Sequence, residues 1–323
     1  MKALVTGGAG FIGSHLCEHL LAQGWSVSVI DDLSTGRLEN IAHLKRNRNF
    51  EIVQDTVRNA DLLERLVRPA DAVFHLASAV GVKLIIQQPV RTIETTVEGT
   101  MELLSLASRH RKKVIITSSS EVYGKGTKVP FSEGDDTVHG PTTTRRWAYA
   151  AAKAMDEFLA MAHWYETRLP VVCARLFNTV GPRQTGLYGM VVPRFVAQAL
   201  RGEDITVYGD GKQTRAFCHV ADVVPALVRL VECPDAYGKV VNIGNPSEVT
   251  INQLAKRVKE LTASRSRIVH VPYEQAYVEG FEDMRRRVPD ITLVKSLIGF
   301  EPALSLDDIL ESVIADLRGK ESV

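Results

Sequence analysis

The chain has 323 residues, of which 24% are charged, and its formal net charge is +1. This length allows one large domain, or two closely joined ones, with a substantial core. The balanced charge gives no global field that would favour nucleic acid or a membrane surface, so neither is expected as a partner.

The cysteines and the hydropathy pattern exclude several further classes. Four cysteines lie far apart and form no CxxC pair: Cys17, Cys173, Cys218 and Cys233. This indicates reduced thiols in packed positions rather than a disulfide framework or a zinc site, and no metal is expected. No apolar run approaches the roughly 18 residues of a membrane span, and the chain opens directly into a strand without a charged and then apolar leader. We expect a soluble, cytoplasmic protein.

Short β-branched runs alternate with helical patterns along the first half. The expected strands cover residues 2–5, 25–30, 50–55, 71–77, 112–120 and 169–176. Apolar spacing of three and four predicts helices over 14–23 and 97–110, and helical segments are also expected over 96–109 and 149–165. Strand and helix in alternation predict an α/β fold with a doubly wound, parallel Rossmann sheet and right-handed crossovers.

The pattern changes after about residue 177. A helix is expected near 193–201, a strand at 206–208, and a buried strand at 240–243 that returns to the main sheet. The sequence therefore predicts a Rossmann domain of residues 1–177 and 216–247. Residues 178–215 and 248–323 would form a smaller, discontinuous C-terminal lobe.

A glycine-rich turn follows the first strand directly. Gly7 allows a tight turn, Gly10 lets a pyrophosphate approach, and Gly13 permits close helix packing, with the helix N-terminus facing the phosphates. The second strand ends at Asp31 and Asp32, whose carboxylates can accept hydrogen bonds from ribose hydroxyls and repel a 2'-phosphate. The sequence predicts NAD rather than NADP as the cofactor.

Further cofactor contacts are expected along the carboxyl edge of the sheet. These residues are Phe11, Ile12, Ser34, Thr35, Gly36, Asp55, Thr56, Leu76, Ala77 and Ser78. Two neighbouring residues are ambiguous. Arg37 is either an exposed loop charge or a group that weakens the preference for NAD, and His75 is either near the cofactor or a structural histidine.

A tyrosine and a lysine lie one helical turn apart at Tyr149 and Lys153. Alone, this pattern is more typical of a core aromatic beside a solvated lysine. Together with the glycine turn and with Ser119 at the end of the fifth strand, it indicates catalysis. Lys153 and the positive nicotinamide should lower the phenol pKa from about 10, so that Tyr149 acts as a base, while Ser119 hydrogen-bonds the same substrate hydroxyl.

Five segments occur in the order typical of one family: TGGAGFIGSHL, SSSEVYG, YAAAK, ARLFNTVGPR and TVYGDGKQTRAF. With them the whole chain resembles the extended short-chain dehydrogenases/reductases that act on nucleotide sugars. The resemblance implies bound NAD, a UDP-sugar substrate, a nucleotide-sugar-binding C-terminal lobe and a homodimer built on a four-helix interface. It also implies these substrate contacts: Ser120, Asn178, Val191, Tyr208, Gln213, Arg215 and Arg285.

Three local features bear on the branch of that family. Ser120-Glu121 lacks the Asp-Glu pair of the 4,6-dehydratases. The motif of residues 280–291 ends in Arg-x-Pro-Asp-Ile. This ending resembles the corresponding segment of UDP-glucuronate decarboxylases (UDP-xylose synthases) and UDP-apiose/xylose synthases, with Arg287 at their catalytic arginine. Arg146-Trp147 is similar to the 4-amino-arabinose-pathway decarboxylase. Ser119 replaces the usual threonine of the decarboxylases but keeps the hydroxyl.

Arg285 instead favours the epimerase branch, because it matches a phosphate-binding arginine of the epimerases. The triplet from Arg285 to Arg287 could also be a solvated basic loop. The leading hypothesis is decarboxylation of UDP-glucuronate through a C4-keto intermediate, with Glu121 and Arg287 managing the carboxylate and the return of a proton at C5. The product would be a UDP-pentose or a UDP-4-keto-pentose. The alternatives are a UDP-sugar 4-epimerase and a non-catalytic sensor of NAD or nucleotides.

Overall fold

Seven strands form one parallel sheet in this computed structural model, which describes residues 1–78, 88–186, 190–272 and 285–321. The order is β11-β6-β5-β4-β1-β2-β3. Strands that follow β1 in the sequence are added first on one side of it and then, from β4 onward, on the other side, so the topological switch point lies between β1 and β4. The strands are β1 (Lys2–Thr6), β2 (Ser26–Asp31), β3 (Phe50–Gln54), β4 (Ala72–His75), β5 (Lys113–Ser119), β6 (Val171–Leu176) and β11 (Lys239–Ile243). The doubly wound α/β fold is confirmed, and so is the return of the strand near residue 240 to the main sheet.

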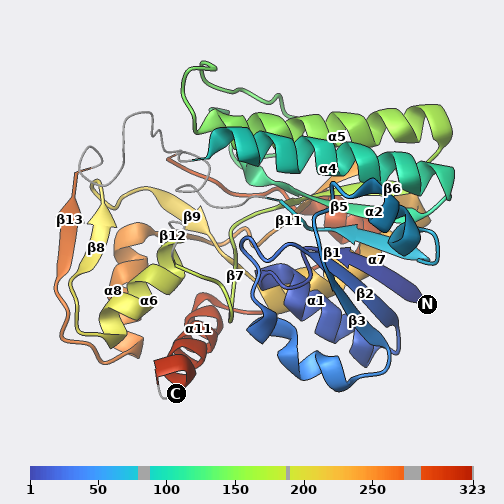
Figure 1. Ribbon diagram of the computed structural model, residues 1–323. Helices are drawn as coiled ribbons and strands as arrows, with labels where there is room; N and C mark the ends of the chain where they lie inside the picture. Colours follow the sequence, from blue (N-terminus) through green and yellow to red (C-terminus); the bar gives the residue numbers. More distant parts are fainter. Residues whose placement is uncertain (79–87, 187–189, 273–284, 322–323) are drawn as a thin grey trace.

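Helices cover both faces of this sheet (Figure 1). Because successive strand side chains point to opposite faces, Ala3 and Val5 pack into one layer and Leu4 into the other. The first layer contains α1 (Phe11–Ala22), α7 (Val220–Val231) and α10 (Thr292–Ile298). The second contains α2 (Ala60–Val67), α4 (Pro89–Arg109) and α5 (Trp147–Thr167). Both layers bury the sheet, which explains its continuous β-branched runs.

A smaller group of elements has its own apolar core beside the carboxyl ends of the strands (Figure 1). It comprises α6 (Val191–Leu200), β8 (Ile205–Tyr208), α8 (Ile251–Leu261), β13 (Ile268–Val271) and α11 (Leu306–Glu321). Two short pairings accompany it, β7 (Thr179–Val180) with β10 (Cys218–His219) and β9 (Thr214–Ala216) with β12 (Glu248–Thr250). Three 3-10 helices complete the described elements: η1 (Leu38–Arg46), η2 (Ser120–Tyr123) and η3 (Pro234–Ala236). The expected domain boundaries stay a prediction.

Several helices begin earlier than the sequence indicates. The α4 helix starts at Pro89 rather than near residue 97, and Pro89 stands at its first positions, where a missing N–H costs nothing. Its first turns carry few apolar side chains, so the spacing of apolar residues shows only the later part of the helix. Three cysteines are buried and Cys233 is partly buried, as expected. Among the described helices, none is long and apolar enough to cross a membrane.

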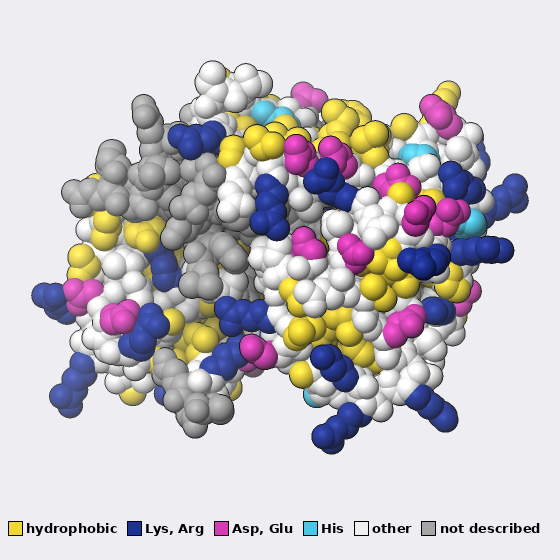
Figure 2. Space-filling model, in the orientation of Figure 1, with side chains coloured by type: hydrophobic (Ala, Val, Ile, Leu, Met, Phe, Trp, Pro, Cys, Tyr) yellow, Lys and Arg dark blue, Asp and Glu magenta, His cyan; other side chains and the backbone are white. Residues whose placement is uncertain are grey.

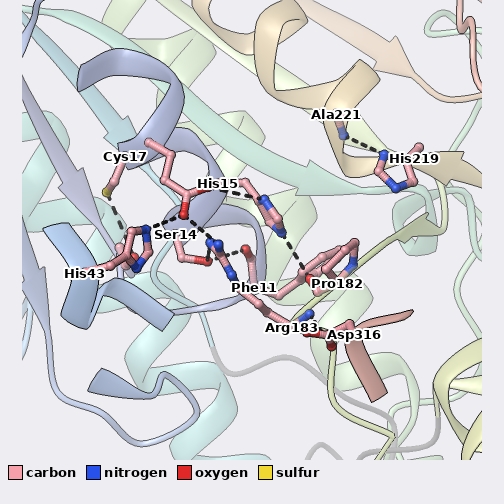
Figure 3. A network of polar contacts seen from close by, with 12 residues as sticks. Phe11, Ser14, His15, Cys17, His43, Pro182, Arg183, His219, Ala221 and Asp316 are labelled. Atoms are coloured by element: carbon pink, nitrogen blue, oxygen red, sulfur yellow. Dashed lines mark hydrogen bonds and ion pairs between the residues drawn. The ribbon is translucent and has the colours of Figure 1, made fainter. Parts of the chain in front are cut away.

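A polar network joins α1 to the start of the smaller lobe (Figure 3). The Arg183 guanidinium donates to Ser14 Oγ at 3.2 Å and to Glu18 Oε1 at 2.5 Å. The Arg183 backbone N–H donates to Asp316 Oδ2 in α11 at 3.0 Å, and the His15 ring donates to the Pro182 carbonyl at 3.0 Å. These contacts hold the segment after β7 against the helix that follows the glycine turn.

Candidate active site

One cavity of about 480 Å³ runs between the carboxyl edge of the main sheet and the smaller lobe. Its volume suits a small organic ligand or cofactor. Nearly all of the sequence-predicted site residues line it. These are Gly7, Gly10, Phe11, Ile12, Gly13, Asp31, Asp32, Ser34, Thr35, Asp55, Thr56, Leu76, Ala77, Ser78, Ser119, Ser120, Glu121, Tyr149, Lys153, Asn178, Val191, Tyr208, Gln213, Arg215 and Arg287. The two predicted residues outside this lining are Gly36 and Arg285.

The glycine turn between β1 and α1 forms one wall of the cavity. Gly7 has a φ of +72°, and a Cβ atom on it would lie 2.9 Å from the Ala77 backbone nitrogen. A Cβ on Gly13 would overlap the Gly7 carbonyl. Side chains are therefore excluded where the backbone turns and where the helix packs. Gly10 caps α1 without a side-chain bond, so the first N–H groups of the helix are available to an anion, as the pyrophosphate of NAD requires.

Asp31 is fixed at the edge of this wall by two backbone N–H groups. Its Oδ2 accepts from Ala9 at 2.9 Å and its Oδ1 from Leu33 at 2.8 Å. Burial raises the pKa of Asp31 above its ordinary value, while these hydrogen bonds lower it. A Cβ on Gly36 would lie 2.8 Å from Asp31 Oδ1, so Gly36 acts by letting the loop approach Asp31. Each carboxylate oxygen can accept a further bond, which fits the hydroxyls of a ribose.

His75 is a structural histidine. Its Nδ1 lies 2.8 Å from Thr6 Oγ1 and its Nε2 lies 3.1 Å from Thr100 Oγ1, in a fully buried position. Burial lowers the pKa of His75 to about 3, so the ring is neutral. Both nitrogens are used within the fold, which leaves the ring no role as an acid or base. Arg37, the other ambiguous residue, is exposed and also lines the cavity.

Tyr149 and Lys153 are buried one turn apart in the first part of α5. Lys153 Nζ donates to Asp156 Oδ2 at 3.0 Å. Burial lowers the pKa of Lys153, but the Asp156 carboxylate and Tyr149 raise it, and the net result lies above the ordinary value. Lys153 is therefore a fixed ammonium next to the phenol.

The Tyr149 pKa is set by burial and by its charged and hydroxyl neighbours. Burial raises it, and although Lys153 and a hydrogen bond with Ser119 lower it, the net result lies above the ordinary value. The sequence-based expectation combined Lys153 with the positive nicotinamide, and it stays a prediction. Burial disfavours the charged phenolate more than one ammonium stabilises it, so the positive nicotinamide is needed as well.

Glu121 lies between two buried arginines beside Tyr149. Its Oε1 is 2.6 Å from Arg287 Nη2, and its Oε2 is 3.2 Å from Arg146 Nη2. Burial raises the Glu121 pKa, but Arg146, Arg287 and, more weakly, Arg215 lower it to about 2. Glu121 is thus a permanent carboxylate at neutral pH, which opposes the expected part for it in returning a proton at C5.

The smaller lobe contributes the opposite wall. Asn178 Nδ2 donates to the Ala216 carbonyl at 2.9 Å, and Gln213 Nε2 donates to the Tyr208 carbonyl at 3.1 Å. The Arg215 guanidinium is buried and donates to the Thr214 carbonyl at 2.7 Å. These bonds orient polar and cationic groups along one wall, where a nucleotide diphosphate would find partners.

Residues 4–313 match the protein family described as GDP-mannose 4,6 dehydratase. The chain is an extended short-chain dehydrogenase/reductase of the nucleotide-sugar epimerase and dehydratase family. It is 41% identical over 322 residues to a UDP-N-acetyl-alpha-D-glucosaminuronate decarboxylase of Bacillus cytotoxicus, covering 99% of both chains. It is 40% identical to UDP-glucuronic acid decarboxylase 4 of Arabidopsis thaliana, covering 98% of this chain and 69% of that one.

The solved structure of one relative contains both a nucleotide sugar and NAD. The crystal structure of the UDP-glucuronic acid 4-epimerase of Bacillus cereus, in complex with UDP-glucuronic acid and NAD, has a TM-score of 0.89 and 28% identity. The alignment covers 99% of this chain and 100% of that chain. The family and its solved members bind NAD, and this chain is an enzyme of the nucleotide-sugar family.

In this family member, the arginine triplet does not act as one group. Arg285 is exposed, its backbone carbonyl accepts from the Thr214 N–H at 2.9 Å, and its side chain does not line the cavity. Arg286 pairs with Glu248 at 2.5 Å on the surface. Only Arg287 of the three is buried at the cavity. The preceding part of the predicted motif, residues 280–284, lies outside the described residues.

Several charged residues at or near the cavity were given no role by sequence reasoning. Arg146, Arg183 and Arg194 line it, and the Arg194 guanidinium lies 3.8 Å from the Tyr208 ring centroid. Asp156 lies beneath it as the partner of Lys153. The spacing of Lys153 and Asp156, three residues apart on one helix, was a usable signal. Glu121 and Glu18, the carboxylate partners of Arg146 and Arg183, are distant from them in sequence, so spacing could not reveal these contacts.

Proposed function

We propose that this protein is an NAD-dependent decarboxylase of a UDP-linked uronic acid, with UDP-glucuronate as the first candidate. The observation that carries the proposal is the buried pair of Arg287 and Glu121 beside Tyr149, because it places a guanidinium suited to a carboxylate at the catalytic base. Two relatives with about 40% identity are named as decarboxylases of such substrates, which supports the same choice.

The reaction follows from the chemistry of a ketone next to a carboxylate. When bound, NAD would accept a hydride from C4 and later return it. Tyr149 takes the proton of the C4 hydroxyl, Ser119 orients that hydroxyl, and Lys153 stabilises the phenolate. The resulting β-keto acid loses carbon dioxide because the electrons of the broken C5–C6 bond flow into the ketone, and the enolate so formed takes a proton from water at C5. Arg287 holds the carboxylate in line before that step.

The two parts of the chain take different ligands in this proposal. Residues 1–177 and 216–247 hold NAD, through the glycine turn and Asp31. Residues 178–215 and 248–323 hold the nucleotide sugar, through Arg215 and its neighbours. The uronic acid could carry a hydroxyl or an acetamido group at C2, since the relatives' names include both kinds.

The 4-epimerase is the second candidate, favoured by the solved UDP-glucuronic acid 4-epimerase at 28% identity. It needs the same oxidation at C4 but keeps the carboxylate. Arg285, its main support in the sequence, is exposed and does not line the cavity. A non-catalytic sensor is the remaining alternative, and the joint presence of Ser119, Tyr149 and Lys153 at the cavity argues against it.

One incubation series separates these candidates. Purified protein with NAD is given UDP-glucuronate, its 2-acetamido counterpart or UDP-glucose. Carbon dioxide, the masses of the UDP-sugars and, by NMR, their configuration at C4 are followed. We expect carbon dioxide from one of the acids, with a UDP-pentose or a keto product lighter by two hydrogens. Isomerisation at C4 without carbon dioxide from either acid would establish the epimerase instead. No turnover of any of the three would favour the sensor.

A further inference from the structure

Arg146 occupies a position that links the catalytic helix to Glu121. It occupies the N-cap position of α5, three residues before Tyr149, and is only 6% exposed. Its Nη2 lies 3.2 Å from Glu121 Oε2 and 3.4 Å from Glu121 Oε1, so it contacts both oxygens of the carboxylate. Arg287 approaches the same carboxylate at 2.6 Å from another part of the chain.

The charges that face Glu121 come from three segments. Arg146 belongs to the start of α5, Arg287 to the segment after residue 284, and Arg215 to β9, while Tyr149 is the titratable neighbour on α5 itself. Arg146 is the strongest of the charges that lower the Glu121 pKa. These charges hold the pKa of Glu121 at about 2, well below its ordinary value, so the carboxylate form predominates at pH 7. Glu121 is therefore suited to orient cations, and unsuited to donate a proton.

We propose that Arg146 is a positioning residue, which holds Glu121 as an oriented anion and thereby fixes Arg287 at the reacting end of the cavity. This inference rests on the proposed decarboxylation. Since a carboxylate held from two sides has little rotational freedom, Arg287 is aligned before the substrate arrives. Without Arg146, Glu121 can turn, and Arg287 loses its alignment although its own charge remains.

The test compares Arg146→Met and Arg146→Lys with wild type, using UDP-glucuronate or its 2-acetamido counterpart, whichever the wild type decarboxylates. The readouts are kcat and KM for carbon dioxide release from pH 5 to pH 9. Arg145→Met is the matched control, because Arg145 is the adjacent arginine and is exposed. Losing Arg146 should lower kcat by about 10-fold or more and change KM by less than about threefold, since the contact acts on alignment. The Lys variant should recover part of kcat, and Arg145→Met should match wild type.

The pH profile gives a readout that a purely structural role would not move. Without Arg146 the Glu121 pKa rises toward its ordinary value, so the activity of Arg146→Met should decline more steeply toward pH 5 than the wild-type activity does. Wild-type kcat and pH profile in Arg146→Met, or a rise in KM alone, would overturn the positioning role. If that variant does not fold, Arg146→Lys decides, because a wild-type kcat there also overturns it. Absence of carbon dioxide from wild type would overturn the proposed function itself, and this inference with it.

Discussion

At the scale of single residues, the proposed catalytic step depends on one phenol. Tyr149→Phe removes the group proposed to take the proton of the C4 hydroxyl and keeps the ring that packs at the cavity. We expect the rate of product formation to fall by about 10² to 10⁴ while NAD still binds. Single-turnover kinetics and calorimetric titration of NAD measure these two quantities. Near-normal turnover would show that the base lies elsewhere.

A second residue-scale prediction concerns Glu121 and acid stability. Its folded pKa of about 2 lies below the ordinary 4.5, so its stabilising contribution is complete above about pH 4.5 and is lost as the pH falls toward 2. Glu121→Gln leaves Arg146 and Arg287 without this carboxylate. We expect a loss on the order of 3 kcal/mol in the free energy of unfolding at pH 7, shrinking at pH 3.

Urea unfolding at the two pH values checks this, with Glu203→Gln as the control. Glu203 pairs with Arg201, and both side chains are 54% exposed, so its loss should cost less than about 1 kcal/mol. If Glu121→Gln and Glu203→Gln lower the free energy of unfolding equally at pH 7, the buried contacts of Glu121 with Arg146 and Arg287 do not stabilise the fold as expected.

The residue scale also shows what the sequence could reveal. The glycine turn, Ser119 and the pair of Tyr149 and Lys153 are recognisable because their spacing follows from the backbone geometry of a turn, a strand end and a helix. The roles of Arg146 and Arg285 are not, because each depends on a contact between distant segments. Glu121 meets Arg146 across 25 positions in the sequence, and no local pattern encodes that distance.

At the scale of elements, the parallel sheet was predictable because most of its strands are buried on both faces and read as β-branched runs. The first residues of the helices were harder to predict from the sequence, as α4 shows. The attachment of the lobe to α1 was not predicted, because Arg183 meets Glu18 and Ser14 only after the chain has folded back on itself (Figure 3).

That attachment gives a prediction at the element scale. A double-mutant cycle of Arg183→Met and Glu18→Gln should show a coupling of about 1 kcal/mol or more in the free energy of unfolding, because the pair is partly buried and hydrogen-bonded. The control cycle uses Arg267 and Asp204, whose side chains are 80% and 38% exposed. Its coupling should stay below about 0.5 kcal/mol. Additive effects at Arg183 and Glu18 would mean that the contact does not fasten the two elements.

At the scale of the whole molecule, one outer face exposes a group of large apolar side chains to solvent. Helices α4 and α5 pack against each other on the second face of the sheet and expose large hydrophobic side chains, which Figure 2 shows gathered over these helices. They are Val90, Ile93, Met101, Met155, Phe158 and Tyr165. Phe158 is 68% exposed and Tyr165 is 79% exposed. A second copy of the same two helices would bury this face in a four-helix arrangement with two-fold symmetry.

We therefore predict a homodimer that a single charge on this face weakens. Light scattering should report a dimer for wild type at micromolar concentration, and Phe158→Asp should raise the dissociation constant by about 100-fold or more, because each interface would contain the aspartate twice. Val138→Asp is the control, since Val138 is also exposed, at 45%, but lies outside α4 and α5. The control should remain dimeric. A monomeric wild type, or dissociation by both substitutions alike, would rule out this face as the interface.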